Sequence, residues 1–206
     1  MMKSNLFSFL VVIPIFALTI NQVKASEMII DNRSTGTLQA SHAGEWRLIT
    51  DQVMGGRSSG VLVMEQYQGR NCLRMRGSVS TETNGGFVQI ALDLAGGKSM
   101  DASNFTGVVL EVKGNGERYN VHLRTSELWL PWQSYRAEFN ADSKWRKIRL
   151  PFREFEPYKT RNRLDPGKLV RIGVVAIGRA FDADLCVGSL AFYKDEGNND
   201  EGDNSP

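Results

Sequence analysis

The stretch that decides the fold is Asp51-Gln52-Val53-Met54-Gly55-Gly56-Arg57-Ser58, and a second stretch, Asn84-Gly85-Gly86-Phe87, is built on the same plan. Each puts paired glycines next to polar residues and leads into a strand-like run. Paired glycines tolerate positive φ and a close approach of the backbone, so both stretches indicate specialised loops. No catalytic constellation accompanies them, so they say more about the fold than about chemistry.

Outside these loops the sequence is a succession of short runs in which apolar and polar residues alternate. Turn residues separate the runs at the spacing of a sandwich or barrel. We expect strands at 60–67, 71–80, 87–92, 107–112, 118–124, 133–139, 145–150, 169–177 and 185–193. Only short turns are expected near 101–104 and 151–155, and Gly114-Asn115-Gly116 predicts a hairpin turn. The pattern predicts an all-β protein.

The two ends of the chain differ from its body. Residues 1–25 predict a cleavable signal peptide, with Lys3, an apolar stretch at 6–20 and a small-residue cleavage site ending at Ala25. An uncleaved anchor is the alternative, although the stretch is shorter than the roughly 20 residues that span a bilayer. Residues 194–206 predict a disordered acidic tail. We therefore expect a single β-sandwich domain over 26–193, in a periplasmic or secreted protein without a stable membrane span after cleavage.

Cys72 and Cys186 are the only cysteines in the chain. An exported protein can form a disulfide, and one intramolecular pairing exists. Both lie in strand-like runs, and alternation with Leu73 and Leu185 on the core side places both on outward faces. Matching faces permit a bridge, but a sequence does not reveal the Cα distance that a disulfide requires. A disulfide and two free thiols both stay open at this point.

Composition and charge favour neither catalysis nor nucleic-acid binding. The net charge is +2 and the arginines are scattered, whereas nucleic-acid binding calls for a basic stripe. The two histidines, His42 and His122, lack metal-ligand spacing to a partner. The sequence holds neither a Gly-x-Ser-x-Gly elbow nor a phosphate-binding glycine loop. We therefore expect no enzyme, no metal, no cofactor and no nucleic-acid partner.

Several motifs in a fixed order resemble one family. Residues 51–58 are similar to the Asp-x-x-Met-Gly-Gly-x-Ser signature of the complex I intermediate-associated protein 30 family, and residues 84–87 to its Asn-Gly-Gly-Phe element. Later segments continue the match in order, so that it runs from Trp46 to Phe192. The resemblance implies a galactose-binding-like jelly-roll β-sandwich of two antiparallel sheets. It also implies mitochondrial relatives that help assemble respiratory complex I, and modules of similar architecture that bind carbohydrates.

The signature residues have mainly structural interpretations. A carboxylate at Asp51 suits a hydrogen bond to the backbone of its own glycine turn, and contact with a ligand or cation is the alternative. Ser58 and Asn84 are interpreted as fastening the two glycine loops in the same way. Met54 is interpreted as filling a gap in the core. The structural motif is completed by Gly55, Gly56, Gly85, Gly86 and Phe87.

The aromatic segment Trp129-Leu130-Pro131-Trp132 is the best candidate for a binding surface. Together with Tyr135 it would stack on sugar rings or anchor a protein partner. Arg124 and Arg136 would supply charged hydrogen-bond donors beside it. The alternative is a long connection whose aromatic residues cover one end of the core, with both arginines at solvated strand positions.

Two functions are compatible with these features. The first is a non-catalytic exported binding module that acts on an unknown protein partner as an assembly or stabilising factor. The second is a carbohydrate-binding module that acts on a glycan of the cell envelope. A hydrolase is a weaker third hypothesis. The fold alone does not choose between them, since one fold hosts many functions.

Overall fold

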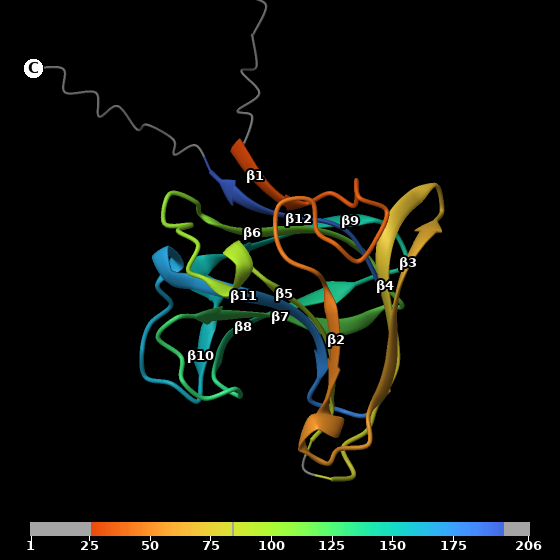
Figure 1. Ribbon diagram of the computed structural model, residues 1–206. Coiled ribbons are helices and arrows are strands. Elements are labelled where there is room, and N and C mark those ends of the chain that lie inside the picture. The colour runs from red at the N-terminus through yellow and green to blue at the C-terminus, as the bar shows by residue number, and fades with distance from the viewer. Residues whose placement is uncertain (1–25, 84, 196–206) are drawn as a thin grey trace, which may run out of the picture.

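The chain folds as two layers of β-sheet packed face to face (Figure 1). The computed structural model describes residues 26–83 and 85–195. Within these ranges each sheet has six strands, and every pairing between the named strands is antiparallel. The structure confirms the predicted all-β, jelly-roll sandwich.

The first sheet is organised around its longest strand, β12, at the C-terminal end of the fold. Its strands are β1 (Ser26–Asp31), β3 (Ser59–Tyr67), β4 (Arg70–Val79), β6 (Gly107–Lys113), β9 (Arg146–Pro151) and β12 (Phe181–Lys194). The order is β3-β4-β12-β6-β9. The first half of β12 pairs with β4, and its second half pairs with β1.

The second sheet carries the surface that matters for function. Its strands are β2 (Arg47–Thr50), β5 (Phe87–Asp93), β7 (Glu117–Thr125), β8 (Ser134–Ala141), β10 (Glu156–Tyr158) and β11 (Leu169–Ile177), in the order β10-β8-β7-β11-β5-β2. Short 3-10 turns connect some strands: η1 (Asp51–Met54), η2 (Ala95–Gly97), η3 (Phe152–Glu154) and η4 (Pro166–Lys168). The side chains of this sheet alternate between the core and an outer face.

All nine predicted strands are present, with bounds that differ by at most a few residues. The expected turns are also found, since Phe105 N–H donates to the carbonyl of Ala102 at 3.0 Å and η3 lies within 151–155. The sequence prediction missed β1, β2 and β10. The last two have 4 and 3 residues, too few to show a clear alternation.

One predicted turn is wrong. Gly114-Asn115-Gly116 does not close a hairpin, because β6 lies in the first sheet and β7 in the second. The segment carries the chain from one layer to the other instead. Gly116 has a φ of 88°, and a Cβ at Gly114 would lie 2.6 Å from the Cβ of Ala141. The glycines thus allow a tight corner between layers, and that need produces the same residue pattern as a hairpin.

The core lies between the two sheets and follows from strand alternation. In β7, Tyr119, Val121 and Leu123 are fully buried, and in β4 so are Leu73 and Met75. Burying a large apolar side chain contributes about 1.5–3 kcal/mol, so these positions account for much of the stability of the sandwich. The intervening residues of each strand therefore project from the outer faces.

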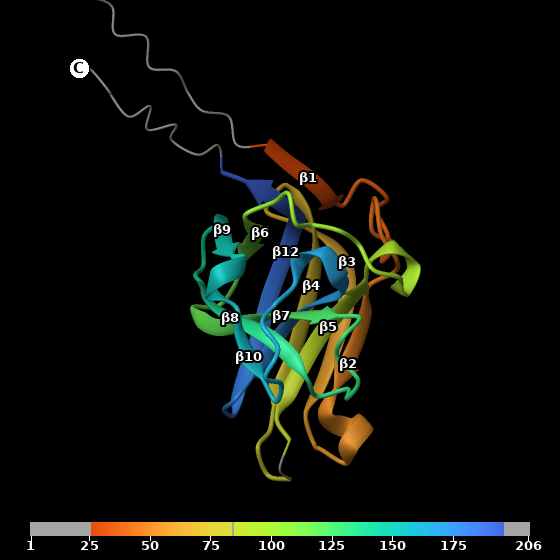
Figure 2. The ribbon, with the colours of Figure 1, turned by 90° about the vertical axis from the view of Figure 1, so that its left-hand side faces the viewer.

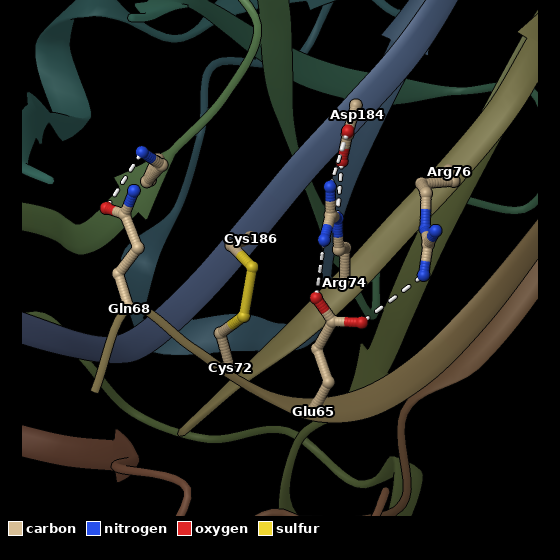
Figure 3. Close-up of a disulfide and its surroundings, with 8 residues drawn as sticks. Glu65, Gln68, Cys72, Arg74, Arg76, Asp184 and Cys186 are labelled. Atoms are coloured by element: carbon tan, nitrogen blue, oxygen red, sulfur yellow. Dashed lines mark hydrogen bonds and ion pairs between the residues drawn. A yellow bond between two sulfur atoms is a disulfide. The ribbon is translucent and has the colours of Figure 1, made fainter. Parts of the chain in front are cut away.

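The structure joins Cys72 and Cys186 in a disulfide, with 5.4 Å between their Cα atoms (Figure 3). They lie on β4 and β12, on the face opposite the core-facing Leu73 and Leu185, as alternation predicts. Both cysteines are nevertheless buried, with at most 2% exposure. Polar side chains surround the bridge on this outer face. Arg74 pairs there with Asp184 at 2.7 Å and with Glu65 at 2.6 Å.

The end of the domain differs slightly from the prediction. The acidic tail was expected from residue 194, but Lys194 is still in β12, and Asp195 N–H donates to the hydroxyl of Thr106 at 3.0 Å. The predicted signal peptide, Asn84 and residues 196–206 lie outside the described residues. Within the described ranges, no helix is long and apolar enough to cross a membrane.

Candidate functional site

Asp51 holds the two glycine loops together. Its carboxylate is completely buried, and its Oδ1 accepts the backbone N–H of Ser58 at 2.9 Å. Its Oδ2 accepts the Ser58 hydroxyl at 2.9 Å and the backbone N–H of Gly86 at 2.6 Å. One side chain therefore binds both its own loop and the loop 35 residues further on. These contacts agree with the structural interpretation of Asp51 and extend it to the second loop.

Both loops require glycine, for two different reasons. A Cβ at Gly56 would lie 2.1 Å from the Asp51 Cγ, and a Cβ at Gly85 would lie 2.7 Å from its Oδ2. Gly55 and Gly86 have φ angles of 82° and 120°, which side chains rarely adopt. The paired glycines thus serve two needs, close approach to a carboxylate and positive φ. Figures 1 and 2 show η1 beside the loop before β5, at the end of the molecule away from β1.

A cleft of about 600 Å³ lies on the outer face of the second sheet. Its floor is formed by outward-facing residues of four neighbouring strands: Gln89 on β5, Gly173 and Val175 on β11, His122 on β7 and Arg136 on β8. One wall comes from η1 and the glycine loops, and the opposite wall from β10 and the connection between β7 and β8. In Figure 1, β10 lies at the lower left of the molecule, and η1 is the orange turn at the bottom, to the right of β10.

Both walls carry apolar side chains. Val53 and Met54 of η1 are 73% and 61% exposed and line the cleft. The interpretation of Met54 as a core residue is therefore wrong, because the 3-10 turn directs it away from the core. On the opposite wall Trp132 and Tyr158 line the cleft with 52% and 38% exposure. The buried Asp51 thus holds in place the segment that carries one apolar wall.

Arg124 organises the connection between β7 and β8. Its Nη1 donates to the carbonyls of Leu130 and Pro131, each at 2.9 Å, and to that of Gln133 at 2.6 Å. Its Nη2 donates to the carbonyl of Leu128 at 3.3 Å. Burial lowers the pKa of Arg124, and the charge of Arg171 lowers it further. The side chain therefore lines the cleft and also fixes the segment that bears Trp132.

Arg136 lies over an aromatic ring at the cleft. Its guanidinium is 3.3 Å from the centre of the Tyr158 ring, and its Nε donates to the Ser134 hydroxyl at 3.0 Å. Burial lowers the pKa of this guanidinium, although Tyr158 opposes the shift. Further along the sheet, the Nε of Arg171 donates to Asp93 Oδ1 at 2.5 Å. The cleft thus holds three guanidinium groups fixed by different partners.

His122 forms part of the floor beside Arg136, its cross-strand neighbour. The imidazole is only 8% exposed, and its Nε2 has no hydrogen-bond partner. Burial, followed by the charge of Arg136, lowers the pKa of His122 to about 3. The histidine is therefore neutral at physiological pH and adds polarity to the floor without adding charge.

The predicted binding residues do not all meet in the cleft. Trp132, Arg124 and Arg136 do. Tyr135 does not, because strand alternation turns it into the core, where it is completely buried and its hydroxyl donates to the carbonyl of Arg163 at 3.1 Å. Trp129 is 91% exposed and lies outside the cleft lining.

Sequence reasoning missed several lining residues. Gln89, Arg171 and Tyr158 were not singled out, and His122 was considered only as a metal ligand. A signal for Gln89 and Arg171 existed, since both occupy outward positions in well-predicted strands. Tyr158 had none, because β10 itself was not predicted. In the described part of the chain, no three His, Cys, Asp or Glu side chains gather as they would around a metal ion.

Comparison with solved structures shows what the fold is similar to. The family 11 carbohydrate-binding module of the cellulosomal cellulase Lic26A-Cel5E of Clostridium thermocellum has a TM-score of 0.60 at 13% identity, covering 82% of this chain and 95% of that one. The family 11 module from Clostridium thermocellum in complex with a beta-1,3-1,4-mixed-linked tetrasaccharide gives 0.60 at 15% identity, covering 81% and 94%. A family 30 carbohydrate-binding module gives 0.56 at 16% identity, covering 85% and 91%.

The fold and the cleft define a class of architecture, the jelly-roll β-sandwiches, here with a cleft of about 600 Å³ on the outer face of one sheet. The sequence matches the family described as Complex I intermediate-associated protein 30 (CIA30) over residues 35–187. This chain therefore belongs to the complex I intermediate-associated protein 30 family, as its motifs indicated. None of the curated proteins matches it.

Proposed function

We propose that this chain is a non-catalytic binding module whose cleft takes a glycan. The observation that carries the proposal is the cleft itself, with Trp132 and Tyr158 on one wall and hydrogen-bonding side chains on its floor. Its volume of about 600 Å³ is typical of small-molecule sites. An oligosaccharide presents apolar ring faces and many hydroxyl groups, and both find partners here.

Aromatic and polar groups have separate tasks in this proposal. The half-exposed ring of Trp132 offers a flat apolar surface on which a sugar ring stacks. Gln89 and His122 offer hydrogen-bond partners to hydroxyl groups at the floor. No Asp or Glu is among the cleft residues that the structure describes, so the two carboxylates that most glycoside hydrolases use are missing from this lining. The similar module solved with a tetrasaccharide supports the choice of ligand class.

A protein partner is the second candidate. The side chains of Trp129 and Leu130 are 91% and 44% exposed, and they lie next to each other in a connection that Arg124 holds. Exposed aromatic residues on an ordered segment are common anchors of protein interfaces. Membership of a family named for association with a complex I intermediate favours this candidate as well.

The proposed place of action is outside the cytoplasm, in the periplasm or the extracellular medium. The sequence of residues 1–25 supports export, and so does the disulfide between Cys72 and Cys186, since such bonds persist in oxidising compartments. Fractionation of cells that produce the full chain tests this. Recovery of the protein in the cytoplasm with both thiols reduced would contradict it.

Single tryptophan variants separate the two candidates. A glycan array identifies a ligand, and calorimetry then measures its affinity for wild type, Trp132→Ala and the matched control Trp129→Ala. A hot-spot aromatic contributes about 2 kcal/mol or more, so Trp132→Ala should weaken glycan binding roughly 30-fold while Trp129→Ala leaves it unchanged. Both melting temperatures should stay near that of wild type.

The other outcomes are equally informative. If Trp129→Ala abolishes capture of a partner from envelope extract and Trp132→Ala does not, the protein-binding candidate replaces the first. If Trp132→Ala loses about 3–5 kcal/mol of stability with glycan binding intact, the ring covers the core and the glycan proposal fails.

A further inference from the structure

The charges that line the cleft have one sign. Arg124, Arg136 and Arg171 all line it, while the described lining contains neither Asp nor Glu. Two carboxylates adjoin this group. Glu156 is exposed on β10 and lies opposite Arg136 in the β10–β8 ladder, but it forms no ion pair with it. Asp93 accepts from Arg171 at 2.5 Å and also pairs with Arg47. One negative charge is thus shared between two guanidinium groups. The cleft is therefore an electropositive surface, although the net charge of the whole chain is only +2.

Two of the three arginines lack a carboxylate partner. Among the ion pairs of the described residues, none involves Arg124 or Arg136. Arg124 is satisfied by backbone carbonyls, which carry no full charge. Arg136 is only partly exposed, and its Nε hydrogen bond to Ser134 involves a neutral hydroxyl. A partly buried charge without a counterion is unfavourable, and a bound anion would compensate it.

The orientation of Arg136 suits recognition of an oxyanion. A guanidinium is planar and presents paired N–H donors that match the two oxygens of a carboxylate. The contact with the Tyr158 ring at 3.3 Å and the bond to Ser134 hold this group in place in advance. Little side-chain entropy would then be lost on binding, which favours affinity. His122, its neighbour across the strands, adds a largely buried imidazole to the floor beside Arg136.

From this arrangement we propose that the cleft takes an acidic glycan, whose uronic acid carboxylate binds Arg136 while a sugar ring packs on Trp132. This proposal rests on the proposed function and narrows it. An acidic peptide would satisfy Arg136 equally well, but the half-exposed aromatic ring of Trp132 suits a sugar ring better. A sulfate ester carries the same oxyanion chemistry and is distinguished from a carboxylate by experiment.

The experiment compares one glycan with and without its charge. Calorimetry measures the affinity of the full mature chain for a panel of uronic acid oligosaccharides. The oligosaccharide that binds best is then measured again after its carboxyl groups are reduced to alcohols. Sulfated and neutral oligosaccharides are measured in the same way. A poly-glutamate peptide is the non-glycan arm. We expect the carboxyl-reduced oligosaccharide to bind at least tenfold more weakly than its acidic parent. Arg136→Gln should weaken the parent at least tenfold and the reduced form less than twofold.

Two control variants keep the result interpretable. Arg136→Lys retains the charge but not the planar pair of donors, so it should bind with intermediate affinity. Arg118→Gln removes an arginine of β7 that is 57% exposed, pairs with Glu138 and lies outside the cleft lining, so it should bind as wild type does. Melting curves of all variants confirm that each is folded.

The outcomes separate this inference from the proposed function. Equal affinity for the acidic and reduced forms, or binding of neutral glycans alone, overturns the acidic ligand and leaves glycan binding standing. Binding of sulfated glycans alone overturns the uronic acid carboxylate as the bound group and identifies a sulfate ester on an acidic glycan in its place. Binding of poly-glutamate without any glycan, or binding of none of the ligands, overturns both proposals.

Discussion

Among single residues, Gly56 has the largest structural consequence, because it packs against the buried carboxylate of Asp51. The three hydrogen bonds to the Asp51 side chain leave no room for a Cβ at Gly56, which is a separate constraint from positive φ. Gly55 shows the other case, since its φ is 82° but nothing lies within 4 Å of an added Cβ. Adjacent glycines in one motif are therefore there for different physical reasons.

This difference predicts unequal effects of alanine at the two positions. Gly56→Ala should lower the free energy of unfolding by about 3 kcal/mol or more, because the methyl group displaces a carboxylate that satisfies buried donors. Gly55→Ala should lower it by only about 1–2 kcal/mol, the cost of the left-handed conformation. Urea unfolding of both variants measures this. Equal losses would show that the packing against Asp51 is unimportant.

His122 makes a second prediction, on pH dependence. Its pKa is about 3 in the folded protein and 6.5 in the reference state, so between these values the unfolded chain binds a proton that the folded chain does not. Stability therefore rises with pH across this window, and acidification below 6.5 should cost about 1.4 kcal/mol per pH unit from this residue alone. His122→Gln should lose this contribution, so its unfolding free energy should fall less steeply between pH 6.5 and 4.5. Parallel curves for the two proteins would contradict a buried neutral histidine.

At the scale of elements, alternation predicted far more than turn chemistry did. The strands from β3 to β9 and β11 to β12 followed from period-two patterns or, as in β6, from a short apolar run, because each packs at least one face against the core. The same alternation in β8 places Tyr135 inward and Arg136 outward. The prediction for Tyr135 was wrong because it grouped this residue with the nearby tryptophans and did not apply the alternation of its own strand. The corner at Gly114–Gly116 was beyond this reasoning, since glycine marks a tight bend without saying which sheet follows.

The connection between β7 and β8 depends on one side chain. Arg124→Met keeps the aliphatic stem but removes the donors that four backbone carbonyls share. We expect a stability loss of about 1–3 kcal/mol and faster hydrogen exchange over residues 126–133. Glycan binding should weaken as well, because Trp132 is no longer held. Arg118→Met serves as the control, and unchanged exchange in Arg124→Met would contradict the role assigned to Arg124.

The disulfide joins two strands that are already neighbours in the first sheet. Cys72 and Cys186 are separated by 114 residues, so the bond closes a long loop in the unfolded chain. Replacing both by alanine should cost about 2–5 kcal/mol, mostly through the freedom that the unfolded state regains. Chemical denaturation of the double variant measures this cost. Mass spectrometry of non-reduced peptides from freshly isolated protein provides a direct check, and two alkylatable thiols would contradict the bond.

At the scale of the whole molecule, the candidate site emerges from segments distant in sequence. One wall comes from the loops held by Asp51, the floor from four strands, and the other wall from a connection and a three-residue strand. The sequence identified the glycine loops and the Trp132 segment separately, but it offered no means of placing them across one cleft. Their facing positions depend on the strand order of the second sheet, which single-sequence patterns do not determine.

The last prediction concerns the start of the mature protein. The first described strand, β1, begins at Ser26, and Ser26 pairs with Lys194 at the end of β12. Cleavage after Ala25 would therefore leave every pairing of β1 intact. Cleavage a few residues later would remove part of the strand that pairs with the second half of β12. N-terminal sequencing and intact mass of exported protein should place the first residue at Ser26. A mature chain that keeps residues 6–20 would contradict signal cleavage, and one that begins beyond Asp31 would show that β1 is dispensable to the folded module.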